Sequence, residues 1–212
     1  MATKYKPILF STEMVQAILE GRKKQTRRII KPQPSLGNGT WDIRNIHEYF
    51  DENGKFISVP KLNTENHKSV KIKTGDILWV RESFAKPPIY AFGVKYIYKA
   101  GFNESICGWK PSIHMPKEAA RIFLEVTNVR VEQLQDISEE DAIAEGIERV
   151  SIAPFVHRFK NYLCNNKFIG PKESFKTLWM KINGEDSWNA NPWVWVYEFK
   201  VVEKPKDFIY EN

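Results

Sequence analysis

Two long runs of strand-forming residues dominate the second half of the sequence. The longest strand candidate is RIFLEVTNVRVEQL, residues 121–134, and a second, PWVWVYEFKVV, covers residues 192–202. β-Branched and aromatic residues favour strands because their side chains pack well on a pleated surface. Within the first run, Thr127 and Asn128 interrupt the apolar pattern, and we expect a bulge or a bend there. Any fold for this chain must accommodate these two extended segments.

Short helices are expected between the strand candidates. The segment 11–21, STEMVQAILEG, begins with the capping residues Ser11 or Thr12 and stops at Gly21. The segment 137–147, ISEEDAIAEGI, has Ser138 as its cap and Gly146 as its stop. These are the residue types that begin and end helices. A third helix is expected in KESFKTLWMKING, residues 172–184.

The remaining strand candidates are short and do not alternate regularly with helices. They cover residues 6–11, 26–31 and 77–84, with one or two more in 90–100. This order favours an α+β fold rather than an α/β fold, and a small mixed β-barrel with short helices at its mouth fits it best.

A single domain over residues 1–212 is expected, because 42% of its residues are hydrophobic and can form one large core. Three stretches rich in loop-forming residues are interpreted as insertions near residues 35–70, 85–115 and 148–172. A short helix or a hairpin is expected in the first, and loops in the third.

The charge balance favours an anionic partner without excluding a neutral substrate. Lysine and arginine number 32 against 26 acidic residues, which gives a formal charge of +6. The sequence has no run near the roughly 20 apolar residues of a membrane helix, and its start does not resemble a signal peptide. We therefore expect a cytoplasmic protein that does not interact with membranes.

Two cysteines and two histidines form pairs with mirrored spacing, Cys107 with His114 and His157 with Cys164. This spacing is wider than that of the usual zinc-binding turns. We predict neither a metal ion nor any other cofactor.

The segment EGRKKQTRRIIKP, residues 20–32, contains five cations between Arg22 and Arg28. On a strand that begins near Thr26, alternation places Thr26 and Arg28 on one face, and Lys23 approaches from the turn after Gly21. A neutral lysine there can take the proton of the threonine hydroxyl, and neighbouring arginines and burial lower the lysine pKa. A solvated basic ribbon that binds phosphate is the alternative.

Four segments in order resemble the ASCH family, small β-barrel domains of the PUA-like superfamily. They are GRKKQTRR, TGDILWV, LEVTNVRVEQLQDISEEDAIAEGI and WVWVYEF. The family signature G-x-K-x-x-[TE]-x-R is matched by Gly21, Lys23, Thr26 and Arg28. Nearly the whole chain also resembles phage and prophage ASCH proteins, through KPILFSTEMVQAILEGRKKQTRR, WKPSIHMP and SWNANPWVWVYEF.

The resemblance implies that the partner is a nucleobase, a nucleoside or RNA. One branch of the family hydrolyses the amide of N4-acetylcytidine with a lysine, a threonine nucleophile and a glutamate. By motif these positions are Lys23, Thr26 and, in the ungapped match, Glu145. Arg28 would then orient the substrate or stabilise an oxyanion. Other members bind or cleave RNA, so a non-catalytic RNA-binding module and a ribonuclease are the alternatives.

Further candidates for the substrate site come from three other segments. Arg81 and Glu82 fall on opposite faces of their strand, so one of them faces the barrel mouth or forms a salt bridge between strands. His114, in a proline-flanked loop, belongs to a lid or to the surface. The last strand has an aromatic stripe that forms core, unless a member such as Trp195 stacks on a base. The stripe comprises Trp193, Trp195, Tyr197 and Phe199.

Overall fold

A computed structural model describes most of the chain. The described residues are 5–31, 33, 46–50, 56–60, 71–87, 93–102, 108–153, 156–164 and 168–208. None of the helices in these ranges is long and apolar enough to cross a membrane.

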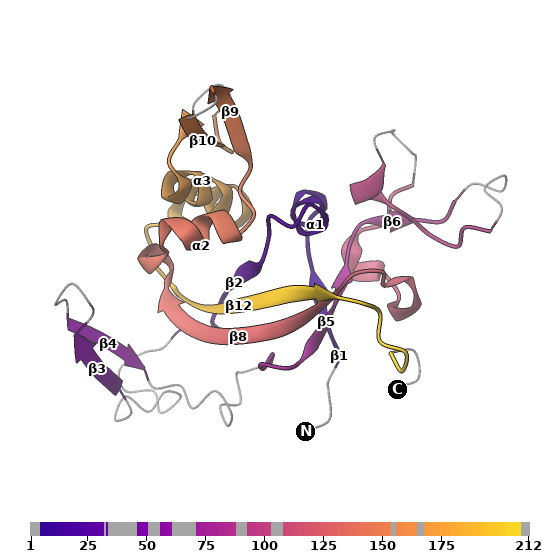
Figure 1. The fold of residues 1–212 in the computed structure, drawn as a ribbon, viewed down its shortest axis with the longest axis horizontal. Helices are drawn as coiled ribbons and strands as arrows, with labels where there is room; N and C mark the ends of the chain where they lie inside the picture. The colour runs from indigo at the N-terminus through magenta and orange to yellow at the C-terminus, as the bar shows by residue number, and fades with distance from the viewer. Residues whose placement is uncertain are drawn as a thin grey trace.

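A mixed five-stranded sheet organises the described part of the fold. Its strand order is β1-β5-β8-β12-β2, with β1 parallel to β5 and the other neighbours antiparallel. The strands are β1 (Tyr5–Leu9), β2 (Gln25–Ile29), β5 (Ile77–Arg81), β8 (Phe123–Gln133) and β12 (Trp193–Val202). The two long strands β8 and β12 run side by side across the molecule (Figure 1). Strand β2 is an edge strand, bonded within this sheet to β12 alone.

The expected irregularity in the longest strand is a β-bulge. On β12, Glu198 pairs with Asn128 and the next residue, Phe199, pairs with Val126. Thr127 is therefore the extra residue on β8. A bulge bends its strand and increases the local twist, and Figure 1 shows β8 curving along its length.

Three α-helices accompany the sheet, and the fold class is α+β as predicted. They are α1 (Thr12–Leu19), α2 (Glu139–Ala144) and α3 (Pro171–Asn183). The Ser11 hydroxyl accepts from the Met14 N–H at 3.3 Å, and the Ser138 hydroxyl accepts from the Asp141 N–H at 3.0 Å. Both serines therefore cap helices as expected. Short 3-10 helices lie at Lys99–Gly101, Ser112–His114, Lys117–Ala119, Leu134–Asp136 and Glu185–Ser187. The described strands form open sheets, so barrel closure stays a prediction.

The insertions contain more β-structure than the sequence indicated. A hairpin of β3 (Ile46–Phe50) and β4 (Phe56–Pro60) lies in the first insertion, in agreement with one of its two expected forms. The third, expected to consist of loops, contains an antiparallel sheet of β9 (Arg149–Ala153), β10 (Val156–Lys160) and β11 (Phe168–Ile169). These strands have only two to five residues each, and this shortness concealed them in the sequence. A two-residue pair, β6 (Phe84–Ala85) with β7 (Ile97–Tyr98), completes the strands.

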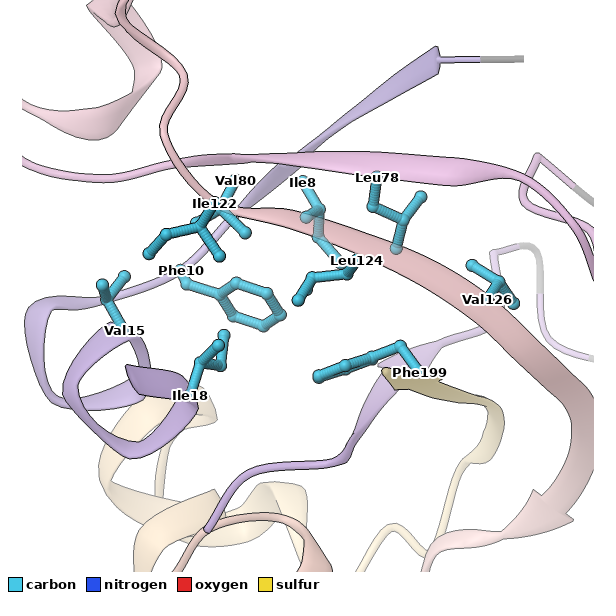
Figure 2. Close-up of a cluster of buried hydrophobic side chains, with 10 residues drawn as sticks. All are labelled: Ile8, Phe10, Val15, Ile18, Leu78, Val80, Ile122, Leu124, Val126 and Phe199. Carbon is cyan, nitrogen blue, oxygen red and sulfur yellow. The ribbon is translucent and has the colours of Figure 1, made fainter. Parts of the chain in front are cut away.

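The two faces of β12 belong to different hydrophobic clusters. Val194 and Val196 pack with α2 and α3, whereas Trp195 and Tyr197 pack with Ile30. A further cluster joins α1 to the strands, with Phe10 at its centre between the helix and Phe199 (Figure 2). Its members are Ile8, Phe10, Val15, Ile18, Leu78, Val80, Ile122, Leu124, Val126 and Phe199. Strand β2 thus lies where α1, α3 and the sheet edge meet.

Candidate functional site

Main-chain contacts join the basic segment to the end of α2. Gly21 has a φ of +72°, which turns the chain after α1, and the Lys23 N–H donates to the Ala17 carbonyl at 2.9 Å. The Lys24 N–H donates to the Ala144 carbonyl at 2.8 Å, and Lys23 forms an antiparallel bridge with Glu145. Residues 122 positions apart, Lys23 and Glu145, are therefore neighbours by virtue of the backbone.

Glycine at position 146 makes this approach possible. Gly146 has a φ of +88°, and a Cβ on it would lie 2.7 Å from the Lys23 Cβ and 3.0 Å from the Ala17 Cβ. Any other residue would collide there and would also strain the backbone. From the sequence, Gly146 was only a helix stop; the close approach to Lys23 was missed, because it depends on the tertiary structure.

The Lys23 and Glu145 side chains form a buried ion pair. The Lys23 Nζ donates to the Glu145 Oε2 and to the Glu145 main-chain oxygen, both at 2.8 Å, and the two side chains are 1% and 5% exposed. Burial lowers the pKa of Lys23, the carboxylate of Glu145 opposes this, and the charges of Arg28 and Arg27 add to the lowering. The net shift of the Lys23 pKa is downward, and burial is its largest cause.

Arg27 holds the same carboxylate from its other side. Its fully buried guanidinium donates to the Glu145 Oε1 at 3.0 Å and to the Asp141 Oδ2 at 2.8 Å. It also donates to the Glu132 Oε1. Burial acts to lower the pKa of Arg27, but these three carboxylates together raise it. Because Arg27 neutralises Glu145, Lys23 can lose its proton without leaving an uncompensated buried carboxylate. The role of Arg27 in neutralising Glu145 was not predicted from the sequence.

Thr26 and Arg28 lie on the other face of β2. They pair with Tyr197 and Trp195, whereas Arg27 pairs with Val196. Thr26 is buried, and no described residue makes a hydrogen bond to its hydroxyl. The Arg28 guanidinium donates to the Leu9 carbonyl at 2.7 Å.

The Phe10 ring links Lys23 to Arg28. The Lys23 Nζ lies 5.8 Å and the Arg28 Cζ 5.4 Å from the centroid of this ring, so both cations contact the same aromatic side chain. Beside Arg28, burial raises the pKa of Tyr197 to about 12, with Arg28 acting in the opposite sense. The phenol of Tyr197 is thus a neutral group near neutral pH.

A pocket of about 250 Å³ lies along β2 and collects the three candidate catalytic residues. Its walls come from α1, β2 and α3, and Glu145 at the end of α2 also lines it. The indole N–H of Trp179, a wall residue, is buried and has no hydrogen-bond partner among the described residues. The lining residues are Met14, Lys23, Thr26, Arg27, Arg28, Ile29, Lys31, Glu145, Phe175, Leu178, Trp179, Ile182 and Asn183.

Five other sequence candidates are not among the lining residues. Glu82 is buried and accepts two hydrogen bonds from Arg121, at 2.8 and 3.0 Å, which is the salt-bridge alternative. Arg81 donates to the Ile113 carbonyl, and His114 is exposed. Trp195 packs in the core. Burial therefore excludes Trp195 as an exposed stacking platform. Gly21 shapes the turn that leads to Lys23, but it does not line the pocket either.

The chemistry available in this pocket is proton transfer beside an apolar wall.

No protein-family model, curated protein or solved structure matches this chain. Of the residues weighed as metal ligands, Cys107 lies outside the described residues. Within the described ranges, no three His, Cys, Asp or Glu side chains gather in a way that could hold a metal ion. The pocket therefore has to be interpreted from its own side chains.

Proposed function

We propose that this chain is an ASCH-type, PUA-like domain that binds a nucleobase, nucleoside or RNA element beside β2 and hydrolyses the amide of N4-acylated cytidines. The curved five-stranded sheet would be the described part of the barrel. One observation carries the proposal: a buried lysine with a lowered pKa lies in the same pocket as a threonine whose hydroxyl has no hydrogen-bond partner among the described residues. Perturbed titratable groups in a pocket are typical of catalytic sites.

The first half of the reaction transfers the acyl group to the protein. Neutral Lys23 accepts the hydroxyl proton of Thr26 as the Thr26 oxygen attacks the acyl carbonyl carbon. The carbonyl oxygen becomes an oxyanion, which the Arg28 charge stabilises. The carbon–nitrogen bond then breaks, and the departing 4-amino group of cytidine receives the proton from Lys23 through Glu145. The products of this half are cytidine and an acyl ester on Thr26.

The second half returns the protein to its starting state. Lys23, neutral again, takes a proton from a water molecule, whose oxygen attacks the ester carbon. The ester bond breaks, the Thr26 oxygen recovers a proton, and a carboxylic acid leaves. Arg27 keeps Glu145 compensated throughout, because its guanidinium stays charged at every accessible pH.

A non-catalytic RNA-binding module is the second candidate, and one contact favours it. The Lys23 Nζ donates its hydrogen bonds to Glu145 and not to the Thr26 hydroxyl. In that case the pocket-lining cations Arg28 and Lys31 bind phosphate, and the affinity falls steeply with salt. Substitution of Thr26 by valine would then leave binding unchanged.

The deciding experiment compares hydrolysis of N4-acetylcytidine by four purified proteins: the unaltered chain, Lys23→Ala, Thr26→Val and Lys24→Ala. We expect release of acetate by the unaltered chain and a loss of at least about 10³-fold in kcat for the first two variants. Lys24→Ala is the matched control, because Lys24 is an exposed neighbour that does not line the pocket. Its rate should equal that of the unaltered chain.

Absence of turnover on every N4-acylated cytidine tested would overturn the hydrolase. RNA binding that weakens with salt and persists in Thr26→Val would then support the binding module. Equal losses in Lys23→Ala and Lys24→Ala would show that general positive charge, and not the buried lysine, accounts for the activity.

A further inference from the structure

The main chain of β2 has an open side that faces the pocket. The Ile30 N–H donates to the Trp193 carbonyl at 3.0 Å, and the Phe199 N–H donates to the Lys24 carbonyl at 2.9 Å. In an antiparallel ladder, hydrogen-bonded pairs alternate with non-hydrogen-bonded pairs. The register therefore directs the N–H and C=O groups of Thr26 and Arg28 toward β12. Those of Arg27 and Ile29 point away from it.

The open side begins at Arg27. Before it, α2 covers the strand, because the Lys24 N–H and the Gln25 side-chain amide both donate to α2 carbonyls, at 2.8 Å. From Arg27 onward, no described residue makes a hydrogen bond to the outward main-chain groups. Arg27 and Ile29 both line the pocket. Unpaired main-chain groups at a sheet edge are a ready template for an incoming ligand.

The size and walls of the pocket select the kind of ligand. Pockets for drug-sized ligands enclose about 300–1,000 Å³, so about 250 Å³ suits one small ring system rather than an extended peptide strand. The walls include the buried aromatic side chains of Phe175 and Trp179, so this side of the pocket is apolar. The unpartnered Trp179 N–H is one more donor next to this space.

The outward N–H and C=O of one residue form an adjacent donor and acceptor. They match a planar ring that carries an acceptor beside a donor, as cytosine does with its ring N3 and its 4-amino group. We propose that the main chain of Arg27 and Ile29 reads this edge of the base, so that the strand backbone determines which rings the pocket accepts. This inference rests on the proposed function, because it assumes that a nucleoside occupies the pocket.

Amide hydrogen exchange in the ¹⁵N-labelled full chain tests the inference, with cytidine as the probe because cytidine is the product and is not turned over. We expect the Arg27 and Ile29 amides to exchange quickly in the free protein and at least about tenfold more slowly at saturating cytidine. The Arg28 amide is the internal control. It is bonded to β12, so it should be protected in both states.

Two further probes isolate the main-chain groups. N4,N4-Dimethylcytidine has no donor at the 4-position, and we expect it to bind at least about tenfold more weakly than cytidine, because one main-chain acceptor then lacks a partner. Ile29→Pro removes the outward N–H, which an edge strand tolerates, and Ile29→Val is its matched control. We expect the proline variant alone to lose affinity.

The outcomes separate this inference from the proposed function. Cytidine binding without any change at the Arg27 and Ile29 amides would overturn the inference and leave the hydrolase intact. Equal affinity for cytidine and its dimethyl derivative would do the same. Failure to bind cytidine together with failure to hydrolyse N4-acetylcytidine would overturn both. If Ile29→Pro does not fold, the exchange measurement decides.

Discussion

Two buried glutamates, Glu82 and Glu145, occupy comparable surroundings but differ in what they can do. Both side chains are at most 5% exposed, and each accepts hydrogen bonds from cations of other segments. Glu82 is paired with Arg121, whose guanidinium also stacks on the Tyr98 ring at 4.2 Å. Glu145 is shared by Arg27 and Lys23. Only the second carboxylate therefore has a partner that can lose its proton.

The difference teaches when a buried ion pair can be reactive. Arginine stays protonated in proteins, so Arg121 cannot give up a proton beside Glu82. Burial lowers the pKa of Lys23, and Arg27 compensates the carboxylate that remains when the lysine is neutral. A pocket also adjoins Lys23, and it does not include Glu82. A lysine that can lose its proton and an adjacent pocket together distinguish the Lys23–Glu145 pair from the structural Glu82–Arg121 pair.

The largest expected effect is that of Arg27→Met. It leaves Glu132, Asp141 and Glu145 without their shared guanidinium, and breaking a buried ion pair costs about 3–5 kcal/mol. We expect urea unfolding to show a loss of that size in the free energy of unfolding. Arg27→Lys is the control, since it keeps the charge but not the forked geometry. Its free energy of unfolding should lie between those of the unaltered chain and Arg27→Met. A loss below about 1 kcal/mol would show that the network contributes little.

Glu82→Ala removes the other buried carboxylate, the one that pairs with Arg121. We expect the free energy of unfolding to fall by about 3 kcal/mol, less than for Arg27→Met because Arg121 is partly exposed and can be rehydrated. Hydrolysis of N4-acetylcytidine per folded molecule should not change, as measured by kcat after correction for the folded fraction. A well-folded Glu82→Ala protein without activity would instead place Glu82 in the functional site.

Sequence patterns predicted the parts of this fold that depend on local chemistry. The serine caps of α1 and α2 and the bulge at Thr127 follow from nearby residues. The neighbourhood of Lys23 and Glu145 followed from the family resemblance. The role of Arg27 did not, because it depends on Glu132 and Asp141, which lie more than 100 residues away in sequence. The strands at 149–169 were missed because they have only two to five residues each.

The Lys23 titration gives a smaller, pH-dependent effect. The folded pKa of Lys23 lies below its ordinary 10.5, so between these two values the unfolded chain binds more protons than the folded one. Stability from this residue therefore rises with pH through that window, by about 1.4 kcal/mol for each unit of difference. Relative to Lys23→Met, the unaltered chain should gain thermal stability as the pH rises toward 10.5. A difference that stays constant with pH would contradict the lowered pKa.

The smallest effect is expected from an exposed ion pair on the same sheet. This pair shows how much solvent exposure alone reduces the coupling energy. Lys200 and Glu125 are cross-strand partners on β12 and β8, 3.1 Å apart, with side chains 60% and 38% exposed. Water screens such a pair, so its coupling energy should be about 0.5 kcal/mol or less and should vanish at high salt. A double-mutant cycle of Lys200→Ala and Glu125→Ala measures it. A coupling energy near that of the buried pairs would mean that solvent exposure does not determine the strength of these ion pairs. The difference between Glu82 and Glu145 would then depend only on the ability of Lys23 to lose its proton.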